Sequence, residues 1–225
     1  MKVLFADSLP DEYADQLRAR GDECEVRGDL TADDLPGAIE GVDVLVVRST
    51  RVTADTIANS DRLGLIVRSG AGTNTIDCEA AANAGIYVCN VPGTNSLAVA
   101  ELTMGLLLAV DRHIADATAD LRRGTWNKVA YSRSDGVFGK TLGIIGLGRT
   151  GLRVARIARL GFEMEIIYHD QRENSEAEAE LGARRVELDE LLARSDIVTL
   201  HVNFSPETEH LIDSAALAKM KRGAY

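Results

Sequence analysis

A glycine-rich turn between two apolar segments constrains the fold of this chain more than any other feature of its sequence. The apolar run 142–145 predicts a short buried strand, and the turn Gly146-Leu147-Gly148 follows at once. Residues 149–160 carry an apolar stripe at helical spacing, and Gly161 is expected to end that helix. The segment therefore predicts a strand, a tight turn and a helix.

The glycines of this segment suit a loop that holds a phosphate group. Gly146 permits the bend, Gly148 leaves room for a pyrophosphate, and Gly151 allows the helix to pack closely on the strand. The backbone N–H groups of Arg149 and Thr150 would then face an anion at the helix N-terminus. We therefore expect these five residues to bind a dinucleotide.

An acidic residue follows at a suitable distance. Asp170 ends the apolar run 166–169 and lies 19 positions past Gly151, where a carboxylate can accept hydrogen bonds from the adenosine ribose. Since it would repel a 2′-phosphate, NAD is expected in preference to NADP, although the nearby Arg172 weakens that preference. Glycine-rich turns also occur in plain loops and in methyltransferases, so a structural turn and a site for S-adenosylmethionine remain as alternatives.

Charge, hydropathy and cysteine content exclude several classes of protein. The net charge of −10 offers no electrostatic basis for binding nucleic acid or an anionic membrane, and the longest apolar run, 104–110, is too short to span a bilayer. Cys24, Cys78 and Cys89 are odd in number and lack C-x-x-C spacing, so we expect no disulfide framework and no metal site. Reduced, buried thiols in a cytoplasmic protein are the interpretation that we favour.

Alternating apolar and helical segments predict an α/β fold with doubly wound parallel sheets. Turn residues at 90–96 mark a boundary, so we expect a first domain over 1–95 and a nucleotide domain over 125–225. Between them, residues 96–124 are expected to form one long apolar helix that connects the domains and faces a second subunit. A further strand begins at 223–225, so the nucleotide domain is expected to be incomplete.

Two loops of the first domain lie at the predicted carboxyl ends of strands, where such sheets bind ligands. One loop contains Arg48 and Ser49, and the other is residues 69–74. Arg48 could bind an anion or form a surface ion pair. The backbone of the second loop could form a nest for a carboxylate or be an ordinary turn.

The motifs of the chain, taken together, resemble the D-isomer-specific 2-hydroxyacid dehydrogenases, and within that family the phosphoglycerate dehydrogenases. The segments that carry the resemblance are Val47–Ser49, Arg68–Asp77, Asn90–Glu101, Gly139–Gly151, Asp170 and His201–Ile212. The resemblance implies a flavodoxin-like substrate domain, a Rossmann-type NAD domain inserted after the long helix, and a homodimer around that helix. It implies hydride transfer between nicotinamide and C2 of a hydroxy or keto acid, with a substrate that resembles 3-phosphoglycerate.

The resemblance also implies roles for individual residues. Gly70, Ala71 and Gly72 would hold the substrate carboxylate, with Arg48 and Ser49 on the substrate side, and Gly146, Gly148, Arg149, Thr150, Gly151, Asp170, His201 and Val202 would bind the cofactor. The sequence departs from the usual family pattern at Thr75, Thr150, Asn203 and Arg222. The first three could alter loop geometry or the fit of the cofactor.

The catalytic Arg, Glu and His of the family have no counterpart among these residues, so the resemblance implies a chain truncated at its C-terminus. None of the four histidines, His113, His169, His201 and His210, occupies the position of the family base. We therefore expect the 225-residue chain to lack turnover. The alternative is an inactive NAD-binding, regulatory or dimerising protein of the same fold.

Overall fold

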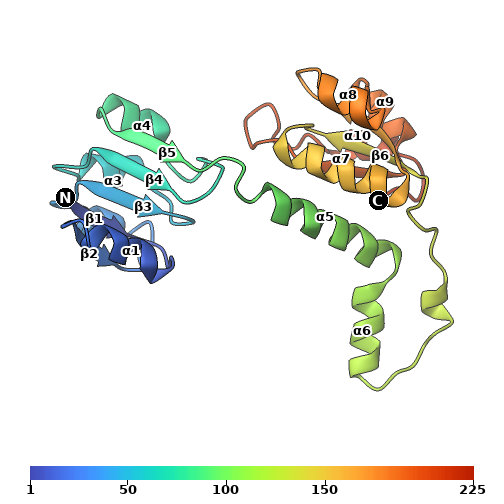
Figure 1. The fold of residues 1–225 in the computed structure, drawn as a ribbon, viewed down its shortest axis with the longest axis horizontal. Coiled ribbons are helices and arrows are strands. Elements are labelled where there is room, and N and C mark those ends of the chain that lie inside the picture. Colours follow the sequence, from blue (N-terminus) through green and yellow to red (C-terminus); the bar gives the residue numbers. More distant parts are fainter. The chain divides into compact units, whose positions relative to one another are not determined.

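The computed structural model describes residues 1–225, which form two compact units, Met1–Asn95 (unit 1) and Ser96–Tyr225 (unit 2). Each unit is a parallel β-sheet with helices on its faces (Figure 1). The fold class is therefore α/β, as the alternating pattern of the sequence predicted.

Unit 1 has a sheet of order β2-β1-β3-β4-β5 in which all neighbours are parallel. Its strands are β1 (Lys2–Phe5), β2 (Glu23–Val26), β3 (Val44–Val47), β4 (Leu65–Arg68) and β5 (Tyr87–Asn90), and its helices are α1 (Asp11–Arg18), α2 (Leu35–Ala38), α3 (Ala54–Ala58) and α4 (Cys78–Asn83). Each strand is followed by a helix, which is the connection that parallel strands require.

The helices of unit 1 cover the two faces of its sheet unequally. Leu4, Leu45 and Ile66 point to one face and pack with residues of α2, α3 and α4. Val3 and Val46 point to the other, where α1 supplies the covering helix. On that second face β4 and β5 carry no helix from unit 1. Consequently Tyr87 is 77% exposed and Cys89 is exposed as well.

The expectation of buried thiols is therefore wrong for two of the three cysteines. Cys89 lies on the uncovered part of the sheet, and Cys78 is the first residue of α4, directed toward solvent. Only Cys24, in β2, is partly buried, and its burial raises the pKa of its thiol. All three thiols are unpaired.

Unit 2 has a sheet of order β8-β7-β6-β9, again entirely parallel. Its strands are β6 (Thr141–Ile145), β7 (Glu165–His169), β8 (Arg184–Arg185) and β9 (Ile197–Leu200), and its helices are α5 (Ser96–Asp111), α6 (Ile114–Arg122), α7 (Arg149–Phe162), α8 (Ser175–Leu181), α9 (Leu188–Arg194) and α10 (Ser214–Lys219), with a 3₁₀ turn at Ala130–Ser132. Tyr225 extends the sheet beside β9, because its N–H donates to Asp196 O and its carbonyl accepts from Val198 N.

Both faces of the unit 2 sheet are covered. Helices α5 and α7 pack on one face, where Met104 and Ala155 meet Ile144 and Ile166 of the sheet. Helices α9 and α10 pack on the other face. This is the doubly wound arrangement predicted for the nucleotide domain.

The predicted single long helix over 96–124 is wrong, because the chain breaks between α5 and α6. His113 takes the left-handed conformation, with φ 52°, between the two helices. The buried carboxylate of Asp111 accepts hydrogen bonds from Gly136 N (2.9 Å) and Tyr225 OH (3.1 Å), which fixes the end of α5 on the core of unit 2. Helix α6 buries no residue and extends away from that core (Figure 1).

The end of α7 also differs from the prediction. Gly161 lies inside the helix, which continues to Phe162, and Glu163 takes the left-handed conformation at its C-terminus with φ 53°. A non-glycine residue therefore ends this helix. Gly161 is left as an open helical position, and an added Cβ there would meet no atom within 4 Å.

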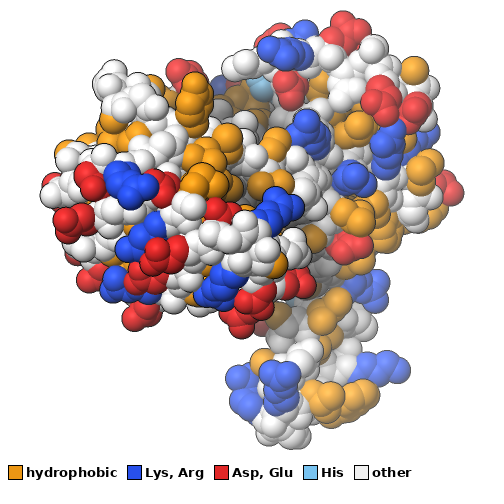
Figure 2. All heavy atoms as spheres, turned by 60° about the vertical axis from the view of Figure 1, so that its left-hand side comes forward, with side chains coloured by type: hydrophobic (Ala, Val, Ile, Leu, Met, Phe, Trp, Pro, Cys, Tyr) orange, Lys and Arg blue, Asp and Glu red, His pale blue; other side chains and the backbone are white.

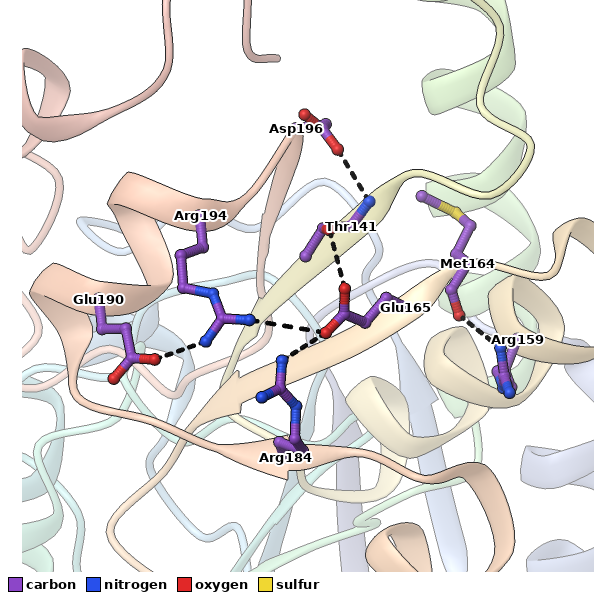
Figure 3. A network of polar contacts seen from close by, with 8 residues as sticks. All are labelled: Thr141, Arg159, Met164, Glu165, Arg184, Glu190, Arg194 and Asp196. Atoms are coloured by element: carbon purple, nitrogen blue, oxygen red, sulfur yellow. Dashed lines mark hydrogen bonds and ion pairs between the residues drawn. The ribbon is translucent and has the colours of Figure 1, made fainter.

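A network of charged side chains joins the amino ends of the unit 2 strands (Figure 3). Glu165, the first residue of β7, pairs with Arg184 and with Arg194, and Arg194 also pairs with Glu190 at 2.7 Å. Asp196 accepts from the backbone N–H of Thr141 at 2.9 Å. Because ligands of such sheets bind at the carboxyl ends, we assign this network to stability.

Charges of both signs are interspersed on the face of the molecule seen in Figure 2, without an extended basic patch. None of the helices has the length and apolar character needed to cross a membrane.

Candidate functional site

The glycine turn of unit 2 is a tightly packed connection between β6 and α7. Gly146 has φ 91°, a conformation that favours glycine, and its N–H donates to His169 O at 2.9 Å. A Cβ added to Gly151 would lie 2.3 Å from Gly146 O, so only glycine allows α7 to approach the turn this closely. The predicted reasons for Gly146 and Gly151 are therefore confirmed.

Two side chains hold the peptide groups of Leu147 in the middle of the turn. Its N–H donates to Asp170 Oδ2 at 2.8 Å, and its carbonyl accepts from Asn174 Nδ2 at 3.0 Å. Asp170 follows β7, and Asn174 is the N-cap of α8, where its Oδ1 also accepts from Ala177 N. Asp170 therefore has a structural role that the sequence did not predict: its carboxylate holds the glycine turn. The ribose contact predicted for it is a separate role.

The N-terminus of α7 presents unpaired backbone donors. The first N–H of the helix with a backbone acceptor is that of Leu152, bonded to Gly148 O at 2.9 Å, and no side chain caps the helix. The N–H groups of Arg149, Thr150 and Gly151 therefore remain for an anion. A Cβ added to Gly148 would meet nothing within 4 Å, which leaves open space in front of these donors. These residues fit the pyrophosphate of a dinucleotide.

The predicted residues His201 and Val202 adjoin the same turn. A Cβ at Gly146 would meet the carbonyl of His201 at 2.8 Å and a methyl group of Val202 at 2.9 Å, and His201 N donates to Ile145 O at 2.7 Å. The imidazole Nε2 lies 3.0 Å from the hydroxyl of Thr199, and burial lowers the pKa of His201. Burial therefore favours the neutral form of the ring.

In unit 1, Asp7 shapes the loop that contains Arg48 and Ser49. Its Oδ2 accepts from the backbone N–H groups of Arg48 (2.6 Å), Ser49 (3.1 Å) and Thr50 (3.1 Å). Both predicted residues are exposed after β3, and Arg48 forms no ion pair. Because one carboxylate accepts all three N–H groups, it fixes the backbone from which the side chains of Arg48 and Ser49 extend, at the carboxyl end of the sheet.

The second predicted loop follows β4 and contains Gly70, Ala71 and Gly72. Gly70 N donates to Arg68 O at 2.8 Å, so only the N–H groups of Ala71 and Gly72 are available to a ligand. Of the three residues predicted to hold the substrate carboxylate, Ala71 and Gly72 have backbone N–H groups without a backbone acceptor. Asn90 Nδ2 donates to Ala71 O at 2.5 Å and so ties the loop to β5.

Arg68 is a residue of this region that the sequence interpretation did not single out. A Cβ on Gly70 would fall 1.6 Å from its guanidinium, so that group lies directly against Gly70. Its buried Nε has no hydrogen-bond partner, and it lines one groove of unit 1 together with Arg48, Ser49 and Asn95. The signal in the sequence was a cation as the last residue of β4, directly before the glycine loop. Asp7 and Asn174 gave no comparable signal.

The model of the D-isomer specific 2-hydroxyacid dehydrogenase NAD-binding domain matches residues 104–225, which is more than half of the chain. The chain belongs to this family. Its glycine turn, α7 and Asp170 are accordingly part of an NAD-binding domain, and NAD is the cofactor of the family model. The resemblance drawn from the sequence motifs is confirmed.

Named relatives of this dehydrogenase family agree with that assignment. D-3-Phosphoglycerate dehydrogenase of Methanocaldococcus jannaschii is 43% identical over 226 residues, which cover 100% of this chain and 43% of the relative. Hydroxypyruvate reductase of Thermotoga maritima is 45% identical over 95% of this chain and 69% of its own length. The chain thus spans less than half the length of the phosphoglycerate dehydrogenase that it matches.

Solved structures share the fold of this chain. A Thermus thermophilus protein is 35% identical, with a TM-score of 0.90 over 100% of this chain and 72% of the other. An NAD-dependent formate dehydrogenase of Staphylococcus aureus, solved in complex with NAD, is 27% identical, with a TM-score of 0.87 and the same two coverages of 100% and 72%.

Proposed function

We propose that this chain is the substrate- and NAD-binding part of an oxidoreductase that transfers hydride between C2 of a D-2-hydroxy or keto acid and nicotinamide. The observation that carries the proposal is the set of unpaired amides at Arg149, Thr150 and Gly151 beside the open space at Gly148. Asp170 lies at the end of β7, where it can accept from the ribose hydroxyls. When bound, NAD supplies the hydride acceptor.

The substrate that we propose resembles 3-phosphoglycerate. Two available amides, at Ala71 and Gly72, suit a carboxylate, and two guanidinium groups, Arg48 and Arg68, face one groove without an acidic partner. An acid that carries a second anionic group would use both kinds of donor. The names of the phosphoglycerate dehydrogenase and hydroxypyruvate reductase relatives support this class of substrate.

We propose further that the 225-residue polypeptide binds but does not turn over. Oxidation of a hydroxy acid needs a base for the hydroxyl proton, oriented by a partner carboxylate. Of its histidines, His113 sits between α5 and α6, His169 is bonded to Val186 O, and His210 is exposed. The imidazole of His201 is bonded to a threonine hydroxyl instead of a carboxylate.

Binding is tested by titrating the chain into NADH and following the fluorescence of the dinucleotide. We expect wild type to bind, and Gly148→Ala to bind at least about tenfold more weakly, because a methyl group would occupy the space in front of the amides. Gly161→Ala is the matched control, since its added Cβ also meets no atom within 4 Å but lies near the far end of α7. Equal affinity of both variants would argue against this site.

Turnover is tested separately, with hydroxypyruvate or phosphohydroxypyruvate and NADH. We expect no loss of NADH absorbance above background with the 225-residue chain. Measurable turnover would refute the proposal that this polypeptide lacks a base. NADH binding without turnover is also what the alternative, a regulatory NAD-binding protein, would give. Co-purification with a longer relative would favour that alternative.

We propose that α5 also mediates a homodimer. Its inner face packs on α7 through Ala100, Met104 and Leu107, yet Leu102, Leu106 and Val110 form an exposed apolar stripe at i, i+4 spacing on the same helix. Leu106→Glu should convert the dimer to a monomer in light scattering. Leu217→Glu in α10 is the control, because both leucines are 58% exposed. A monomeric wild type would refute the dimer.

The three unpaired thiols support a cytoplasmic location.

A further inference from the structure

Three arginines without acidic partners belong to the segments that carry the proposed dinucleotide site. They are Arg149 at the start of α7, Arg172 two residues past Asp170, and Arg185 in β8. The arginines of unit 2 that do form ion pairs are Arg123, Arg156, Arg184 and Arg194. Arg153 and Arg159 of α7 form no ion pair either, so the three arginines are distinguished by their positions next to Gly148 and Asp170.

The guanidinium of Arg185 is held in a fixed position. Its Nε and Nη2 donate to the carbonyl of Asp170 at 3.1 and 2.9 Å, and Nη2 also reaches the carbonyl of Gln171 at 3.3 Å. These acceptors are neutral, so the positive charge is retained, and it lies directly beside the residue that faces the ribose. A preorganised guanidinium loses little freedom when it binds an anion.

The carboxylate of Asp170, which would repel a 2′-phosphate, is already engaged by the protein. Oδ2 accepts from Leu147 N at 2.8 Å, and Oδ1 accepts from Arg172 N at 3.1 Å. Two N–H dipoles thus offset part of its charge. The segment that follows β7 contains two acidic groups, Asp170 and the exposed Glu173. The positive charges near it are those of Arg149, Arg172 and Arg185.

We propose that this site binds NADPH as well as NADH, with Arg172 and Arg185 as the residues that receive the 2′-phosphate. The inference rests on the cofactor site proposed above and adds a specificity to it. Arg185 supplies a guanidinium fixed beside the ribose, and the exposed Arg172 side chain supplies one that can close over the phosphate. Asp170 retains lone pairs for the ribose hydroxyls of NADH, so neither dinucleotide is excluded.

The test is a set of NADH and NADPH dissociation constants, measured by isothermal titration calorimetry on the 225-residue chain. We expect wild type to bind the two dinucleotides within about tenfold of each other. Arg172→Gln and Arg185→Gln should each weaken NADPH about fivefold, the effect of one exposed charge pair, and change NADH less than about twofold. Added salt should weaken NADPH more than NADH.

Arg159→Gln is the control, because Arg159 also lacks an acidic partner but lies ten residues beyond Arg149 along α7. It should leave both constants unchanged. Equal losses of NADH and NADPH in the arginine variants would overturn the proposal and assign these side chains to adenine stacking. NADPH binding about a hundredfold weaker than NADH binding would also overturn it. Absence of NADH binding would instead refute the cofactor site itself.

Discussion

Replacing Gly151 by alanine tests whether the close contact between α7 and the glycine turn is the reason for this residue. The added Cβ would lie 2.3 Å from Gly146 O, 3.2 Å from Ile144 Cγ2 and 3.3 Å from Gly146 C. The first contact must lengthen by about 0.7 Å to reach the 3.0 Å that real Cβ atoms observe. Because the obstructing atom belongs to the backbone of a turn held by hydrogen bonds, it cannot rotate away.

The energetic consequence follows from two opposing terms. Overpacking of a well-filled site costs about 1–3 kcal/mol, and the backbone obstruction favours the upper end of that range. The higher helix propensity of alanine returns about 1 kcal/mol, so we expect Gly151→Ala to lower the free energy of unfolding by about 2 kcal/mol. Gly161→Ala in the same helix meets no atom and should raise it by about 0.5–1 kcal/mol.

The assay is thermal unfolding followed by circular dichroism. Trp126, the only tryptophan, is 78% exposed and would report poorly on the core. A difference of about 3 kcal/mol between the two variants corresponds to a separation of roughly 10 °C in the Tm of unit 2. NADH binding should weaken in Gly151→Ala alone, because the turn must move. Equal Tm values for the two variants, with unchanged NADH affinity, would refute the packing argument.

Three further changes test other parts of the structure. Thr75→Val should leave stability unchanged or raise it by about 0.5–1 kcal/mol in urea unfolding, because the buried hydroxyl of Thr75 has no partner, and a clear loss would reveal a hidden hydrogen bond. Asp111→Ala should cost about 2–4 kcal/mol in the same measurement, since Gly136 N and Tyr225 OH lose their acceptor, and a neutral result would contradict that role. Burial lowers the pKa of His201 below its ordinary value of 6.5, so the unfolded state binds more protons than the folded state. The stability that the neutral His201 ring contributes is fully present above pH 6.5 and is lost as the pH falls through the pKa of the folded state. The stability difference between wild type and His201→Gln should therefore shrink below that pH, and a pH-independent difference would count against a buried neutral ring.

The sequence determined the fold class and the central turn because those features depend on local rules. Apolar runs of strand length followed by amphipathic segments require parallel strands with helical crossovers, whatever else the chain contains. Gly146 and Gly151 could be interpreted from spacing alone, since a tight bend and a close helix approach have few other solutions. Asp170 was identified in the same way, by its distance from the glycines.

Only the tertiary structure decided how distant residues support these motifs. Asp7 holds the loop of Arg48 across 41 residues of sequence, and no periodicity predicts such a pairing. Helix α5 ends at Asp111, whose carboxylate is bonded to Tyr225, 114 residues away, whereas the apolar pattern of 97–121 suggested one continuous helix. Local propensity sets which elements form, whereas side chains brought together by the folded chain decide where a helix stops and which amides and charges remain available to a ligand.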